Sequence, residues 1–159
     1  MAGDYFIKAS IEAPGNISIK MYTLDISSLD KKRLNQRDMS LYEYSIKTVS
    51  GIIRKGNAIK FTQKDIISNN ISASWFGFRD RYFVLVVKPE YDVGGVNTKV
   101  SSDEMISFFS VPRETSQSFG IEIYCGPQIF EYLKKYNKGF EEIVVFSKYG
   151  ILDSISKII

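Results

Sequence analysis

"SASWFGFRDRYFVLVVKPEY", residues 72 to 91, is the stretch that decides the fold. It gathers an unusual number of aromatic side chains, including the only tryptophan of the chain: Trp75, Phe76, Phe78, Tyr82 and Phe83. A block rich in valine follows and ends at Pro89. Aromatic and β-branched residues pack well on the pleated surface of a sheet, and proline stops a central strand. The segment therefore predicts two strands joined by a turn near Arg79 and Asp80.

Two interpretations of this aromatic cluster remain open at the level of sequence. Rings on neighbouring strands of a sandwich form a core, because each of them buries a large apolar area. The same rings can instead line a groove that holds a partner or an extended apolar ligand. The five aromatic residues of the segment are therefore also the candidates for a partner-binding cleft.

Outward from this segment, alternating side chains predict further strands. Residues 4–13 and 17–26 alternate on either side of the turn-forming Pro14-Gly15-Asn16, which predicts a hairpin. Residues 118–126 alternate with Phe119, Ile121 and Ile123 on one face. Short strands are expected between residues 41 and 70, and "DVGGVNT", residues 92–98, has the composition of a loop.

The pattern changes to a helical one near the C-terminus. Apolar residues follow Pro127 at helical spacing, and proline is common at the start of a helix. This pattern predicts a helix over about residues 127–137. The tail, residues 147–159, places apolar side chains along one stripe of a second helix. The candidate membrane-facing residues of this amphipathic helix are Tyr149, Ile151, Leu152, Ile155, Ile158 and Ile159.

Many short strands followed by one or two helices predict a mainly β fold, an antiparallel sandwich with C-terminal α-helices. Residues 1–146 are expected to form the sandwich domain, including the helix near 127–137. Residues 147–159 are expected to form the amphipathic helix. There is no internal repeat and no alternation of strands and helices of the kind that builds parallel sheets.

Composition excludes several classes of chemistry. The chain has no histidine, which rules out imidazole bases, His-containing triads and His-ligated metals. Its single cysteine, Cys125, forms no internal disulfide and is expected to be a small buried residue. No phosphate-binding glycine motif is present. We therefore expect no catalytic residues, no metal and no cofactor.

Charge and hydrophobicity indicate the environment only weakly. The net charge of +3 does not by itself indicate nucleic acid, and no nucleic-acid partner is expected. Residues 31–64 hold nine Lys or Arg against two Asp or Glu, a local charge of +7. This is a solvated face or a surface that attracts anionic lipid or an acidic partner. No apolar run approaches the roughly 20 residues of a spanning helix.

Two separated segments resemble one family, the YidC-type membrane protein insertases (YidC/Oxa1/Alb3). The first, "SWFGFRDRYFVLVVKPE", is similar to a segment of their large periplasmic domain, with these matches in order: Trp75, Gly77, Asp80, Tyr82, Phe83 and Pro89. The second, "YCGPQIFEYLKKYNKGFEEIVVFSKYGIL", is similar to the end of that domain at Gly126, Pro127, Leu133, Tyr136, Phe146, Tyr149, Gly150 and Ile151. The two segments cover roughly the last 90 residues, and the first 70 fit as generic strands.

The resemblance implies an antiparallel β-supersandwich like that of galactose mutarotases, on the periplasmic side of the bacterial inner membrane. It implies a non-catalytic accessory domain of an insertase and chaperone that inserts and folds membrane proteins, alone or with the Sec translocon. Expected partners are Sec translocon components, nascent membrane proteins and, through residues 147–159, the membrane surface. Many Gram-negative members have a longer domain, so we expect either a compact version of the domain or missing N-terminal strands. We also expect residues 147–159 to lead toward a transmembrane span that this chain lacks.

A different class of function remains as the alternative. The same sandwich fold occurs in carbohydrate-acting enzymes and carbohydrate-binding modules, where Trp75 and nearby tyrosines would stack on sugar rings. Mutarotases use a histidine with a carboxylate, and this chain has no histidine. A chaperone that holds unfolded segments in an apolar cleft overlaps with the insertase interpretation.

Overall fold

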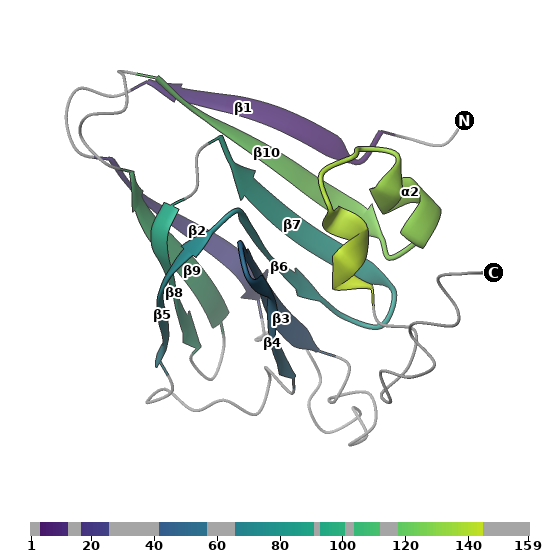
Figure 1. Ribbon diagram of the computed structural model, residues 1–159, viewed down its shortest axis with the longest axis horizontal. Coiled ribbons are helices and arrows are strands. Elements are labelled where there is room, and N and C mark those ends of the chain that lie inside the picture. Colours follow the sequence, from purple (N-terminus) through teal and green to yellow (C-terminus); the bar gives the residue numbers. More distant parts are fainter. Residues whose placement is uncertain are drawn as a thin grey trace. The chain divides into compact units, whose positions relative to one another are not determined.

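The computed structural model describes residues 4–12, 17–25, 42–56, 66–90, 93–100, 104–111 and 118–144 (Figure 1). Ten strands lie in these ranges: β1 (Phe6–Glu12), β2 (Ile17–Asp25), β3 (Glu43–Thr48), β4 (Gly51–Gly56), β5 (Ile66–Ala73), β6 (Trp75–Arg79), β7 (Phe83–Pro89), β8 (Val93–Val100), β9 (Glu104–Val111) and β10 (Ser118–Pro127). They are followed by a short helix, α2 (Phe130–Lys134), and a 3-10 helix, η2 (Phe140–Ile143).

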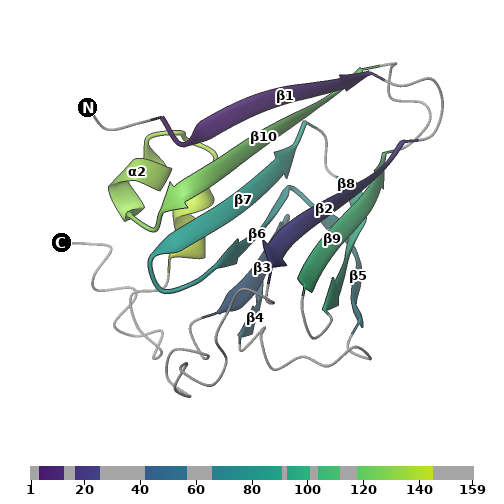
Figure 2. The same ribbon diagram turned by 180° about the vertical axis from the view of Figure 1, so that it is seen from behind.

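The strands form two antiparallel sheets. The first has six strands in the order β1-β10-β7-β6-β3-β4, and the second has four in the order β2-β9-β8-β5. Figures 1 and 2 show the two sheets as separate layers on either side of a common interior. The prediction of a mainly β antiparallel sandwich is confirmed. The hairpin of β6 and β7, predicted from residues 72–91, lies within the six-stranded sheet.

The predicted hairpin of the first two strands is wrong. β1 pairs with β10 and β2 pairs with β9, so the two strands belong to different sheets. Alternating side chains identify a strand because one of its faces is buried. They carry no information on which neighbour supplies the hydrogen bonds. The connection through residues 13–16 therefore joins two sheets rather than two paired strands.

The predicted loop over residues 92–98 is also wrong, because β8 covers most of it. β8 pairs with β5 on one side and β9 on the other, for example Gly94 with Ser72 and Asn97 with Phe108. An interior position in the sheet gives the backbone partners on both edges, and this context outweighs the low strand propensity of glycine and asparagine.

The hydrophobic core lies between the two sheets. Phe109 of β9 is 1% exposed, and its ring centroid is 5.6 Å from that of Phe76 on β6 and 6.1 Å from that of Phe119 on β10. Tyr44, Ile46, Ala73, Phe78, Val87, Val96 and Ile121 complete the buried cluster. Aromatic side chains from both sheets thus fill one continuous interior.

The chain divides into two compact units, one that ends at Pro127 and one that begins at Gln128. The second contains α2 and η2, with Leu133, Phe140 and Ile143 buried. The helix predicted over residues 127–137 is shorter in the structure, where α2 covers Phe130–Lys134. It begins later because Pro127 still pairs with Phe83 as the last residue of β10. The predicted boundary at residue 146 and the tail 147–159 lie outside the described residues. Among those described, no helix has the length and hydrophobicity needed to span a bilayer.

Candidate functional site

β6 holds the first three aromatic residues of the cluster inside the protein. Trp75, Phe76 and Phe78 are 1%, 0% and 5% exposed. Phe76 and Phe78 face the core between the sheets, and the Phe78 ring lies 6.0 Å from that of Tyr42. Trp75 alternates with them and lies on the other face of the strand. All five residues of β6 are buried, so this part of the candidate cleft presents no ring to a partner.

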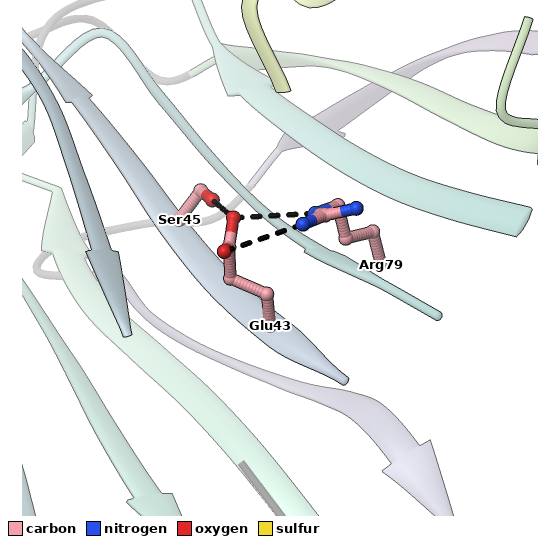
Figure 3. A network of polar contacts seen from close by, with 3 residues as sticks. All are labelled: Glu43, Ser45 and Arg79. Carbon is pink, nitrogen blue, oxygen red and sulfur yellow. Dashed lines mark hydrogen bonds and ion pairs between the residues drawn. The ribbon is translucent and has the colours of Figure 1, made fainter. Parts of the chain in front are cut away.

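The last residue of β6 anchors a buried ion pair. Arg79 donates from Nε to Oε1 of Glu43 at 3.2 Å and from Nη2 to Oε2 at 3.3 Å (Figure 3). The Ser45 hydroxyl donates to the same Oε1 at 3.2 Å. The two ionic side chains are only 9% and 13% exposed. The partner of Arg79 thus comes from β3, the next strand of the sheet.

The turn after β6 is built by Asp80. Its Oδ1 accepts hydrogen bonds from the backbone N–H groups of Tyr82 and Phe83, both at 2.6 Å. Its own N–H donates to the carbonyl oxygen of Phe83 at 3.0 Å. An aspartate that binds the backbone two residues on is a common way to fix a tight turn. Asp80 therefore has a structural role that its matched position in the family resemblance did not reveal.

Beyond Asp80, the aromatic cluster turns outward. Tyr82 and Phe83 are 63% and 59% exposed, in contrast to the three rings on β6. Arg81 is also exposed, and its guanidinium lies 5.4 Å from the centroid of the Tyr82 ring. We call Arg81, Tyr82 and Phe83 the aromatic tip. Its two rings were predicted from the sequence and Arg81 was not, although the adjacent tyrosine was an available signal.

The end of β10 lies beside this hairpin. Phe83 pairs with Pro127, and Leu85 pairs with Cys125. Cys125 is exposed, so the prediction that it is buried is wrong. β1, β10 and β7 continue past the end of the four-stranded sheet in both views, and Ile7 on β1 is 56% exposed (Figures 1 and 2). Ile7 and Cys125 are therefore exposed positions on these long strands.

The other predicted site residues, in the tail, are not shown to lie near the aromatic tip. The membrane-facing candidates of the tail lie outside the described residues. Within the ranges that the structure describes, no group of three or more Cys, Asp or Glu side chains is arranged to hold a metal ion. The geometry gives two distinct environments within residues 75–83: a buried half that holds the sandwich together and an exposed half at its surface.

Comparison with known protein families adds one finding. The family model described as YidC periplasmic domain matches residues 3–159. The match includes both segments on which the resemblance was drawn and extends it over the N-terminal strands. The search of curated proteins gave no match.

Proposed function

Because the chain belongs to the YidC periplasmic domain family, we propose that it is a non-catalytic accessory domain of an inner-membrane insertase. The family places the domain on the periplasmic side of a membrane protein. In this proposal the whole insertase inserts and folds membrane proteins, alone or with the Sec translocon. The domain provides surfaces for contact with translocon components or emerging segments.

The family match over residues 3–159 is the observation that carries this proposal. The described architecture is compatible with this proposal, since a two-layered sandwich with a close-packed aromatic core holds its surface residues in fixed positions. The chain contains no histidine, which leaves it without the commonest general base. Both observations support a role in contact rather than in chemistry.

Binding to the translocon is the part of the proposal that needs a direct test. Purified domain is titrated against Sec translocon in nanodiscs and, as the matched control, against empty nanodiscs of the same lipid. The proposal predicts saturable binding to the loaded discs in excess of binding to the empty ones. Equal binding to both would remove the translocon from the list of partners.

We also propose that residues 147–159 contact the membrane surface through their apolar stripe. Serine at Ile151, Ile155 and Ile158 removes three residues of the stripe and keeps the chain length. Flotation with anionic vesicles is expected to decrease in this variant relative to the parent chain. If both float equally, the tail has no interfacial role.

The carbohydrate-binding alternative loses its main residue. Trp75 is 1% exposed, and a ring that stacks on a sugar needs an accessible face. A glycan-binding screen with the intact chain separates the two functions, since saturable sugar binding would favour a carbohydrate module over the insertase platform.

A further inference from the structure

The aromatic tip exposes two large rings at consecutive residues. Single exposed apolar residues are common on protein surfaces and have no functional meaning by themselves. Here Tyr82 and Phe83 are adjacent, more than half exposed, and located at a turn, while the three preceding rings of the same cluster are buried. Tyr82 lies in the turn that Asp80 builds, and Phe83 is the first residue of β7.

The tip is held in one conformation before any partner arrives. The two hydrogen bonds to Asp80 Oδ1 fix the backbone of Tyr82 and Phe83, and the pairing of Phe83 with Pro127 fixes where β7 begins. A rigid presentation lowers the conformational entropy that binding removes. The tip is thus a preorganised binding element rather than a flexible loop.

One exposed cation lies beside the rings of the tip. The guanidinium of Arg79 is engaged by Glu43, and one carboxylate oxygen of Asp80 is directed to the backbone of the turn. Arg81 is the exposed ionic side chain of this turn, and it lies over the Tyr82 ring. The surface of the tip therefore combines a cation with two rings.

We propose that the aromatic tip inserts into the interface of an anionic bilayer, with Tyr82 and Phe83 at the boundary of headgroups and acyl chains and Arg81 among lipid phosphates. Tyrosine is characteristic of membrane interfaces, where its ring is apolar and its hydroxyl stays hydrated. This inference rests on the proposed function for the presence of a membrane nearby. It adds a contact independent of the tail.

A bilayer fits these residues better than a protein partner. Protein interfaces place aromatic residues at the centre of a complementary patch surrounded by a polar rim. The tip is instead the end of a hairpin, with no apolar residue of comparable exposure on β6, whose five residues are all buried. Two rings at the end of a turn enter a fluid interface without needing a shaped receptor.

The first test uses the full chain and vesicles of phosphatidylethanolamine and phosphatidylglycerol. The test variant is Tyr82→Ser with Phe83→Ser, and the matched control is Val49→Ser, which changes an apolar residue 88% exposed at the turn between β3 and β4. We expect the double variant to bind vesicles about tenfold more weakly, from the apolar area it no longer buries. Val49→Ser is expected to bind like the parent chain.

Arg81→Gln tests the electrostatic part of the inference. Its binding is expected to fall about fivefold on phosphatidylglycerol vesicles and to change little on zwitterionic ones, because one cation near an anionic surface contributes about 1 kcal/mol. Each variant is also made with the serine substitutions in the tail. If a tip substitution still weakens vesicle binding when the tail carries its serine substitutions, the lost binding comes from the tip and not from residues 147–159.

The second test locates the tip directly. Phe83→Trp keeps a ring at the tip, Val49→Trp provides the control, and the buried Trp75 gives the same background in both. With vesicles that contain brominated lipid, Phe83→Trp is expected to shift its emission to the blue and to be quenched, and Val49→Trp is not. Absence of quenching at residue 83, or equal quenching at both, overturns the inference whatever the outcome of the translocon titration.

Discussion

At the scale of single residues, Phe109 connects the two sheets in the core. Its ring lies within 5.6 Å and 6.1 Å, centroid to centroid, of two rings from the other sheet. Phe109→Ala is expected to lower the free energy of unfolding by about 4 kcal/mol, because it removes buried contacts and leaves a cavity between the sheets. Denaturant unfolding measures this difference. Val49→Ala, at a position 88% exposed, is the control and is expected to change stability by less than about 0.5 kcal/mol.

The ion pair of Glu43 and Arg79 is predicted to show strong coupling. Arg79→Met alone leaves the carboxylate of Glu43 only 13% exposed and without its bidentate partner, which costs about 3 kcal/mol of stability. The double variant Glu43→Gln, Arg79→Met is expected to be more stable than Arg79→Met alone, because no charge then remains buried. Chemical denaturation of the complete double-mutant cycle checks this. Additive effects would show that the two side chains act independently.

Residue identity alone singled out the rings at residues 75–83 but did not predict which of them are buried and which are exposed. The alternating pattern places Phe76 and Phe78 on one face and Trp75 on the other, and burial on both faces of β6 makes all three inaccessible. Tyr82 and Phe83 look the same in sequence, yet both are exposed. The difference comes from the hydrogen bonds of Asp80, which a sequence shows only as an aspartate in a turn.

At the scale of the elements, Gly126 explains how β10 fits against the N-terminal segment. A Cβ at this position would lie 2.6 Å from Cγ and 2.7 Å from Cβ of Tyr5, atoms close to the backbone that have little freedom to move. The N–H of Cys125 also donates to the carbonyl oxygen of Tyr5 at 2.9 Å, which holds the two segments together. The glycine of the Gly-Pro pair is therefore required for this close approach.

Gly126→Ala is expected to destabilise the domain by about 2 kcal/mol, because the added methyl group forces β10 and the Tyr5 segment apart. Gly120→Ala is the control on the same strand, since its nearest neighbour is the end of the flexible Glu90 side chain at 2.8 Å. Its cost is expected to stay below about 1 kcal/mol. Thermal unfolding of both variants gives the comparison. An equal loss of stability in both would contradict a specific clash with Tyr5.

The strands themselves were largely predictable, and their pairing was not. Alternation located β1, β2 and β10, and in β10 it corresponds to one face buried at Phe119 and Ile121. The turn at Asp80 separated β6 from β7 correctly. Pairing depends on contacts between distant parts of the chain, so the hairpin around residues 13–16 was wrong. β8 was missed because Asn97 has partners on both neighbouring strands and Gly94 has one on β5, which its composition does not show.

At the scale of the whole molecule, the family was predictable because two motifs, around Trp75 and around Gly126, occur in order along the chain. The family match over residues 3–159 confirms it. The sandwich fold followed from the density of short alternating strands and is confirmed by the two sheets. The exposed rings were predictable only as members of the aromatic cluster, because a cluster of rings is equally suited to a core and to a surface until the backbone places each one.

The proposed function assigns different roles to this domain and to the membrane-embedded part of the insertase. The described part of this chain forms an antiparallel sandwich and two short helical segments. Insertion requires a path for apolar segments into the lipid, which we assign to the membrane-embedded part of the insertase. The present domain is expected to influence the efficiency of insertion through its contacts without performing it.

The most direct measurement is insertion of a client membrane protein into proteoliposomes with three preparations: the whole insertase, the insertase without residues 3–159 of this domain, and the isolated chain. The account predicts that the whole insertase inserts best, that the shortened one keeps most of its activity, and that the isolated chain gives none above empty liposomes. Insertion by the isolated chain, or its complete loss on removal of the domain, would contradict an accessory role.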